Sequence, residues 1–140
     1  MLLQAARTVF LAHGFSAATT DMIQREANVS KSTVYEHYPT KEALFAAVIA
    51  SECEKSMTNV RNVASRATGG LRETLTALAR AYVDLVMSPG GLALFRVAVG
   101  EAPRFPDLAR TFYQAGPRVI RTMAAEHLAS AAASGEIDVS

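Results

Sequence analysis

Residues that start and stop helices alternate in a short stretch near the beginning of the chain. Thr19, Ser30 and Thr40 each carry a hydroxyl that can accept a hydrogen bond from a first-turn amide, so each predicts a helix start. Asn28 tolerates the left-handed backbone conformation that often ends a helix. Pro39 lacks an amide donor and limits the helix before it. The stretch therefore predicts two short helices, a tight turn between them and the start of a third helix.

A longer helix before this stretch supplies the apolar surface that the short helices need. Its apolar positions recur at three- and four-residue spacing, a stripe that includes Leu2, Leu3, Ala6, Val9, Phe10 and His13. Gly14 fits the left-handed position after a helix end, which would pair Phe10 with Phe15. In the short helices, expected over 20–27 and 31–38, Ile23, Val34 and Tyr38 would face this stripe.

The opposite face of the helix at 31–38 is polar and suited to DNA. Ser32, Thr33 and Tyr35 offer hydroxyls for phosphates or base edges, and small residues at 32 and 33 allow close approach. Lys31 and Lys41 each add positive charge to the positive end of a helix dipole, so a negative group is expected there. Each lysine alone could extend into water, but their repetition favours phosphate contact.

Two further residues of this helix leave alternatives open. Glu36 would repel phosphate if it pointed at the duplex, although it could accept from a cytosine amino group; otherwise it lies beside the groove in solvent. His37 could donate to a phosphate or simply be a surface histidine.

The ordered set of residues over 2–50 resembles the DNA-binding domain of the TetR family of bacterial transcriptional regulators. The matching runs are Phe10-Leu11-Ala12-His13-Gly14-Phe15, Ala18-Thr19-Thr20, Val29-Ser30-Lys31-Ser32-Thr33-Val34-Tyr35 and His37-Tyr38-Pro39-Thr40-Lys41-Glu42-Ala43-Leu44-Phe45. The resemblance implies that Lys31, Ser32, Thr33, Tyr35 and His37 face DNA. It also implies that Thr19, Thr20 and Lys41 lie near the DNA backbone.

Composition narrows the class of protein. Half of the residues are hydrophobic and the net charge is +1, which is typical of a globular chain and argues against an indiscriminate nucleic-acid binder. In residues 1–60, five lysines and arginines stand against six acidic residues. A single cysteine, Cys53, excludes an internal disulfide and fits a reducing cytoplasm. No segment is apolar and long enough to span a membrane.

The rest of the chain also has a helical pattern, so the expected fold class is all-α. Helices are expected over 41–64, 71–86 and 92–100, with a long last helix bent or broken at Gly116-Pro117. A domain boundary is expected between a helix-turn-helix domain, 1–45, and a helical ligand-binding and dimerisation domain, 46–140. Residues 100–117, GEAPRFPDLARTFYQAGP, resemble the C-terminal domain of the AefR-like repressors. That resemblance implies two further long helices after Ser140. Either the chain is partial, which we expect, or its dimer surface differs from the usual one of the family.

A ligand cavity is expected between the later helices. Its candidate lining residues are Met57, Tyr82, Met87, Phe95, Phe112 and Tyr113, each of which core packing would explain as well. Arg96 follows Phe95 in an apolar helix and could pair with an anionic ligand, or with Glu101 or Asp84. The three histidines and the cysteine have no metal-ligand spacing, and no catalytic motif or cofactor-binding loop is found, so we expect no enzyme, metal or cofactor.

These expectations combine into one function and one alternative. The first is a ligand-responsive repressor that binds a palindromic DNA operator as a homodimer through residues 31–37 and is released by a small-molecule effector. The alternative is a helical interaction or ligand-binding module that keeps this fold without sequence-specific DNA binding. The acidic balance of residues 1–60, with Asp21 and Glu36 near the proposed DNA face, favours the alternative.

Overall fold

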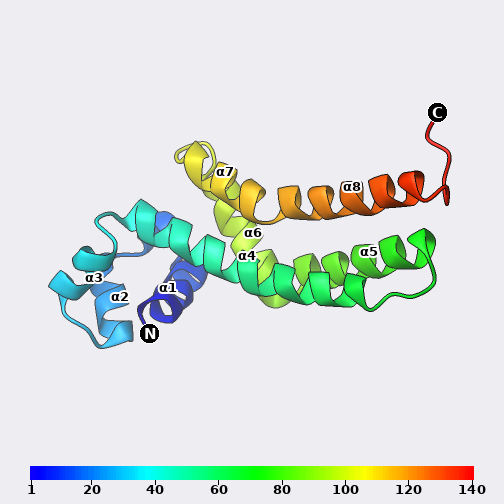
Figure 1. Ribbon diagram of the computed structural model, residues 1–140. Helices are drawn as coiled ribbons and strands as arrows, with labels where there is room; N and C mark the ends of the chain where they lie inside the picture. Colours follow the sequence, from blue (N-terminus) through cyan, green and yellow to red (C-terminus); the bar gives the residue numbers. More distant parts are fainter.

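The computed structural model describes residues 1–140 and contains eight α-helices and no strand, which confirms the all-α fold class. The first three helices form a compact head. The long fourth helix leads away from the head and, together with the helices that follow it, forms the part here called the body (Figure 1). The head contains α1 (Leu2–Ala17), α2 (Thr20–Ala27) and α3 (Lys31–His37). The two chain ends lie at opposite ends of the molecule (Figure 1).

The body is built on α4 (Lys41–Ser65), which the sequence predicted almost to the residue. It is followed by α5 (Leu71–Met87), α6 (Pro89–Glu101), α7 (Pro106–Ala115) and α8 (Pro117–Ala133). In Figure 1, α5 and α8 run beside the far half of α4, while α6 and α7 lie nearer the head. Gly116 separates α7 from α8, so of the predicted bend or break at Gly116-Pro117 the structure has the break.

One hydrophobic core joins the head to the body. Phe10 and Phe15 of α1 and Phe45 of α4 are fully buried, with ring centroids 4.8 to 5.9 Å apart. Phe105, which precedes α7, adds an edge-on contact with Phe15 at 4.7 Å. Leu94 of α6 and Leu108 of α7 belong to the same cluster. A smaller second core farther along α4 consists of Met57, Val60, Ala64, Leu78 and Met123.

Gly14 interrupts the helix where the sequence predicted an end, and Phe10 pairs with Phe15 as predicted. It has a positive φ of 78°, a conformation that favours glycine, yet its ψ of 173° is not that of a left-handed helical residue. One more turn follows, to Ala17. The kink at Gly14 changes the direction of the chain before Phe15, whose ring is fully buried in the core.

The sequence predicted a helix that begins at residue 92, but α6 begins three residues earlier, at Pro89. Ser88 caps α6 by accepting a hydrogen bond from the Gly91 amide at 3.1 Å, and Pro89 occupies the first helical position. A Cβ on Gly91 would lie 2.2 Å from the Leu85 carbonyl oxygen of α5. Glycine is therefore required by the close approach of two helix ends and not by a flexible turn.

Gly91→Ala should lower the free energy of unfolding by about 1–3 kcal/mol, because the new methyl group must displace backbone atoms of α5. Gly100→Ala in the same helix is the matched control, since a Cβ there meets nothing within 4 Å. It should leave stability unchanged or raise it by up to about 1 kcal/mol. Urea unfolding followed by circular dichroism measures both; equal effects of the two substitutions would contradict the close-approach explanation.

Candidate nucleic-acid interface and cavity

The three predicted helix caps are all formed, and they fix the geometry of α2 and α3. The hydroxyls of Thr19, Ser30 and Thr40 accept hydrogen bonds from first-turn amides at 3.1, 3.2 and 3.0 Å. Asn28 ends α2 in the left-handed conformation, with φ 55° and ψ 47°. Local sequence alone therefore specified the turn that holds α3 at its angle to α2.

One face of α3 is buried and the other is open to solvent. Val34 is 1% exposed and Tyr38 packs against the main core, as the spacing predicted. The candidate DNA-contacting residues lie on the opposite side: Lys31, Ser32, Tyr35 and His37 are exposed and Thr33 is half-buried. Glu36 is also exposed.

Hydroxyl groups form a cluster where α2 and α3 approach one another. The Tyr35 and Thr20 hydroxyl oxygens lie 3.4 Å apart, so α2 supports the exposed ring of Tyr35. The Ser30 hydroxyl lies 3.0 Å from that of Ser32 and 2.8 Å from that of Thr33. Because a hydroxyl both donates and accepts, each can exchange its internal partner for a phosphate oxygen or a base edge.

The two lysines at helix starts have different surroundings. Lys31 lies 3.5 Å from Asp21 with both side chains largely exposed, so a carboxylate supplies the negative group expected beside it. Lys41 points back to the end of α1, where its ammonium donates to the carbonyl oxygens of Ala18 at 3.1 Å and Ser16 at 3.4 Å. It also lies 4.6 Å from the centre of the Phe15 ring. Lys41 thus has a structural role that its sequence position did not reveal.

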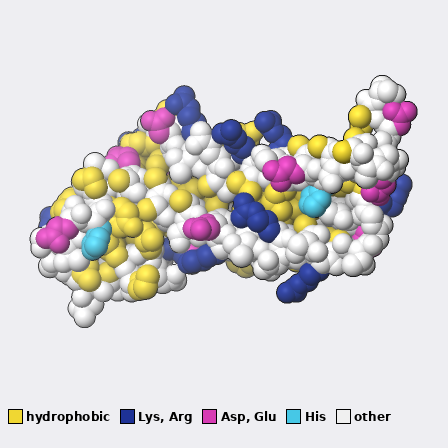
Figure 2. Space-filling model, viewed as in Figure 1, with side chains coloured by type: hydrophobic (Ala, Val, Ile, Leu, Met, Phe, Trp, Pro, Cys, Tyr) yellow, Lys and Arg dark blue, Asp and Glu magenta, His cyan; other side chains and the backbone are white.

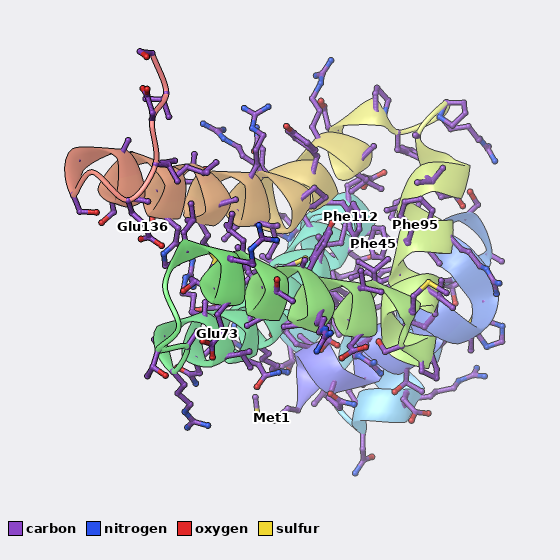
Figure 3. All side chains as sticks on the ribbon, turned by 90° about the vertical axis from the view of Figure 1, so that its right-hand side faces the viewer. Met1, Phe45, Glu73, Phe95, Phe112 and Glu136 are labelled. Atoms are coloured by element: carbon purple, nitrogen blue, oxygen red, sulfur yellow. The ribbon has the colours of Figure 1, made fainter.

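A cavity of about 250 Å³ lies where α4, α5, α6 and α7 meet, close to the first turns of α6 and α8. Four of the seven candidate ligand residues line it: Met57, Tyr82, Phe95 and Phe112. The rings of Phe95 and Phe112 are 6.1 Å apart and edge-on, and Figure 3 shows both at the end of the body opposite Glu73 and Glu136.

The other three candidates lie outside the cavity. Met87, Arg96 and Tyr113 are exposed, because each follows a lining residue by a step that turns it to the outer side of its helix. Arg96 forms no ion pair with Glu101 or Asp84, contrary to the simpler of its two interpretations. The Glu101 carboxylate instead accepts hydrogen bonds from the amide and hydroxyl of Ser16 in α1.

Five polar residues of the cavity wall were not predicted from the sequence: Arg7, Glu52, Cys53, Ser56 and Ser88. Arg7 belongs to α1 and Glu52 to α4, and the Arg7 Nε donates to Glu52 Oε2 at 2.7 Å. Nothing in the local sequence indicates this pairing, because the two residues are 45 positions apart.

Two family models match the chain. "Bacterial regulatory proteins, tetR family" matches residues 2–48, and "AefR-like transcriptional repressor, C-terminal domain" matches residues 73–140. The solved structure of the flavonoid-responsive regulator FrrA is 38% identical and superposes with a TM-score of 0.80, covering 95% of this chain and 67% of FrrA. The chain belongs to the TetR family. Its members are transcriptional regulators with a DNA-binding domain.

Other TetR-family relatives match over shorter or more divergent stretches. A regulator from Mesorhizobium loti has a TM-score of 0.84 at 28% identity, covering 96% of this chain and 67% of its own. The activator FasR of Mycolicibacterium smegmatis is 36% identical over 61% of this chain, and the regulator UidR of Escherichia coli is 35% identical over 43%. The matched segments span 38% of FasR and 31% of UidR.

Two further features of this TetR-family chain concern membranes and metals. No single helix has the length and apolarity to cross a membrane, whereas α5 and α6 together, bent by 72°, pass that test on length and composition. No three His, Cys, Asp or Glu side chains lie together as metal ligands.

Burial keeps the cavity thiol protonated to a higher pH than a solvent-exposed thiol. Cys53 is 7% exposed, and desolvation, followed by the negative charge of Glu52, raises its pKa from 9.0 to about 11. Burial also raises the pKa of Tyr82, with Cys53 as a second cause. The polar wall therefore presents a neutral thiol and a neutral phenol at physiological pH.

The folded state binds the Cys53 proton more tightly than the unfolded state does. Its stabilising contribution is thus complete below pH 9 and decreases as the pH rises toward 11. Wild-type protein should lose about 1.4 kcal/mol more stability than Cys53→Ala between pH 8 and pH 10. Urea titrations at both pH values test this; parallel losses in the two proteins would contradict a buried, protonated thiol.

Proposed function

We propose that this protein is a repressor that binds a palindromic DNA operator as a homodimer and leaves it when a small effector binds. The observation that carries the proposal is α3, a helix capped at its start and buried on the side of Val34. Its outer side presents a lysine, hydroxyls and an imidazole. The match of residues 73–140 to an AefR-like repressor domain supports repression. FasR, named an activator, shows that relatives can have the opposite effect.

Recognition of DNA would depend on close approach more than on charge. Ser32 and Thr33 are small, so α3 can enter a major groove deeply, and the Thr33 methyl group can contact a thymine methyl. Tyr35 and Lys31 would bond phosphates or base edges, with His37 as a further donor. Thr19 and Thr20 at the start of α2 would contact backbone phosphates.

Lys41 is the weakest of the proposed backbone contacts. Two of the three N–H groups of its ammonium are directed at α1 carbonyls, which leaves one for a phosphate. A loss of DNA binding in Lys41→Ala would therefore combine a lost contact with a disturbed head.

Dimerisation follows from the operator symmetry in this proposal. Two recognition helices related by a two-fold axis would lie about one helical turn of DNA, or a multiple of it, apart on the same face. An effector that changed this separation would prevent both helices from fitting successive grooves. As a regulator of bacterial genes, the protein would act in the cytoplasm.

The proposed division of labour places DNA reading in residues 1–45 and effector binding in residues 46–140. The helix α4 is continuous across residue 45. The Phe10 and Phe15 rings of α1 pack against the Phe45 ring of α4 at this boundary. A displacement at the cavity end of α4 would therefore be transmitted to the head as a rigid-body motion. Met57 and Cys53 on α4 line the cavity and would provide the contact with the effector.

The alternative function is an interaction module that no longer binds specific DNA. Asp21 and Glu36 are exposed near the proposed DNA face, and Figure 2 shows basic side chains scattered along the molecule instead of concentrated on the head. A duplex would be repelled by such a surface unless Lys31 and the hydroxyl groups compensated.

Fluorescence anisotropy on the DNA flanking the protein's own gene separates the two functions. Tight binding to one palindromic segment that weakens as salt rises supports the regulator. A folded protein that binds no such segment at low salt would instead support the interaction module.

Tyr35→Phe and Lys31→Met should weaken operator binding in different ways. Loss of the Tyr35 hydroxyl should cost about 0.5–1.5 kcal/mol per recognition helix at any salt concentration. Loss of the Lys31 charge should reduce the slope of log affinity against log salt by about 1 per recognition helix.

Arg110→Met is the matched control, because Arg110 is a highly exposed arginine of α7 in an ion pair with Asp107. It removes the same charge from a different surface and should leave both affinity and slope unchanged. If Lys31→Met and Arg110→Met had the same operator affinity and the same salt slope, Lys31 would not contact the DNA.

A further inference from the structure

The cavity of the body is partly walled by the DNA-binding head. Arg7 comes from α1, whereas the other lining residues come from α4 and later elements. Its neighbours Ala6, Val9 and Phe10 belong to the main core, which joins the head to the body. A ligand that contacts Arg7 would therefore touch the head directly, without α4 as an intermediary.

The guanidinium of Arg7 is held in place by one hydrogen bond, and its other N–H donors have no partner in the protein. Nε donates to Glu52 Oε2 at 2.7 Å, and this is the one hydrogen bond that Arg7 makes. The other Glu52 oxygen lies 3.5 Å from Lys55, which is largely exposed. The Arg7 side chain is 28% and the Glu52 side chain 24% exposed, so the pair is half-buried at the cavity wall. The outer N–H groups of the guanidinium fork thus remain available as donors.

The first turn of α6 leaves room for this fork. A Cβ placed on Gly90 would lie 3.1 Å from Arg7 Nη2, a distance tighter than ordinary van der Waals contact. Gly90 also lines the cavity. The absence of a side chain at this position lets the tip of Arg7 lie against α6 at the cavity edge.

The rest of the cavity is mostly apolar and carries no further charge. Met57, Leu94, Phe95 and Phe112 provide aliphatic and aromatic surfaces, and the neutral polar groups come from Tyr82, Cys53, Ser56 and Ser88. The Arg7–Glu52 pair is neutral as a whole. A ligand for this cavity is therefore small and largely apolar, with one polar end that accepts hydrogen bonds.

We propose that Arg7 binds a carbonyl or phenolate oxygen of a small aromatic ligand through its outer N–H groups, while Glu52 holds the guanidinium in position. A planar fork suits oxygens in the plane of a flat ring system, and the ring system would lie between the apolar side chains. This inference rests on the proposed function, since it specifies the effector class and adds a residue of the head to the effector site. The name of FrrA, a flavonoid-responsive regulator, is consistent with an oxygenated aromatic ligand.

Direct binding of 7-hydroxycoumarin to the full chain tests the proposal without DNA. This probe is a small fused aromatic with a carbonyl and a phenol, and its fluorescence is excited at longer wavelengths than the tyrosines of this tryptophan-free chain absorb. Fluorescence anisotropy should show binding to wild-type protein. Arg7→Met keeps the apolar stem but removes the fork and should weaken binding at least about tenfold.

Arg110→Met again serves as the charge-matched control and should bind the probe as wild type does. Arg7→Lys retains a charge for Glu52 but not the planar fork, so it should also weaken binding of the probe. It replaces Arg7→Met in the comparison if circular dichroism shows that Arg7→Met does not fold. Failure of wild-type protein to bind the probe would overturn the proposal, and so would equal affinities in wild-type protein and the folded Arg7 variant.

Operator anisotropy measured with and without the probe keeps this proposal separate from the proposed function. If wild-type protein binds the probe through Arg7 but binds no operator, the ligand site stands and DNA regulation fails. If it binds operator but its affinity for the probe does not depend on Arg7, the regulator stands and the role of Arg7 fails. With both correct, the probe weakens operator binding in wild-type protein at concentrations that leave the Arg7 variant unaffected.

Discussion

The burial of Phe15 is the interaction on which the rest of this structure depends. The kink at Gly14 turns this ring out of line with α1 and into contact with Phe10, Phe45 and Phe105. Those three rings belong to α1, to α4 and to the segment before α7, so a single side chain touches both head and body. Because packed aromatic rings resist displacement, the orientation of α1 is tied to that of α4 and of the segment before α7.

Polar contacts surround this aromatic centre. Because hydrogen bonds are directional, they fix the relative orientation of the helices more closely than apolar packing alone does. Ser16 donates hydrogen bonds to the Glu101 carboxylate of α6, and the Lys41 ammonium donates to carbonyl oxygens at the end of α1. On the other side of α1, Arg7 meets Glu52. All are hydrogen bonds between groups at or near the surface, so each contributes modestly, and a ligand or a charge change can alter one without unfolding the molecule.

The proposed DNA face combines weak electrostatics with good geometry. Lys31 shares its charge with Asp21, and the head as a whole is not basic, so non-specific attraction to phosphate is small. Specific binding would then depend on hydroxyl groups held at fixed positions by the Ser30 cap and by the Thr20–Tyr35 approach. Such an interface is sensitive to the angle between α2 and α3, and to the separation of two heads in a dimer.

The sequence by itself determined the helices, the three caps, the left-handed Asn28 and the inner and outer faces of α3. Each of these follows from hydrogen bonds and periodicity within a few residues of the chain. It also named four residues that line the cavity, and their contact with an effector stays a prediction. Only the tertiary structure decided where Lys41 and Arg7 find their partners, why Gly91 must be glycine and which side of α5, α6 and α7 faces the cavity. Those outcomes depend on how distant helices approach one another, and that approach is set by packing of the whole core.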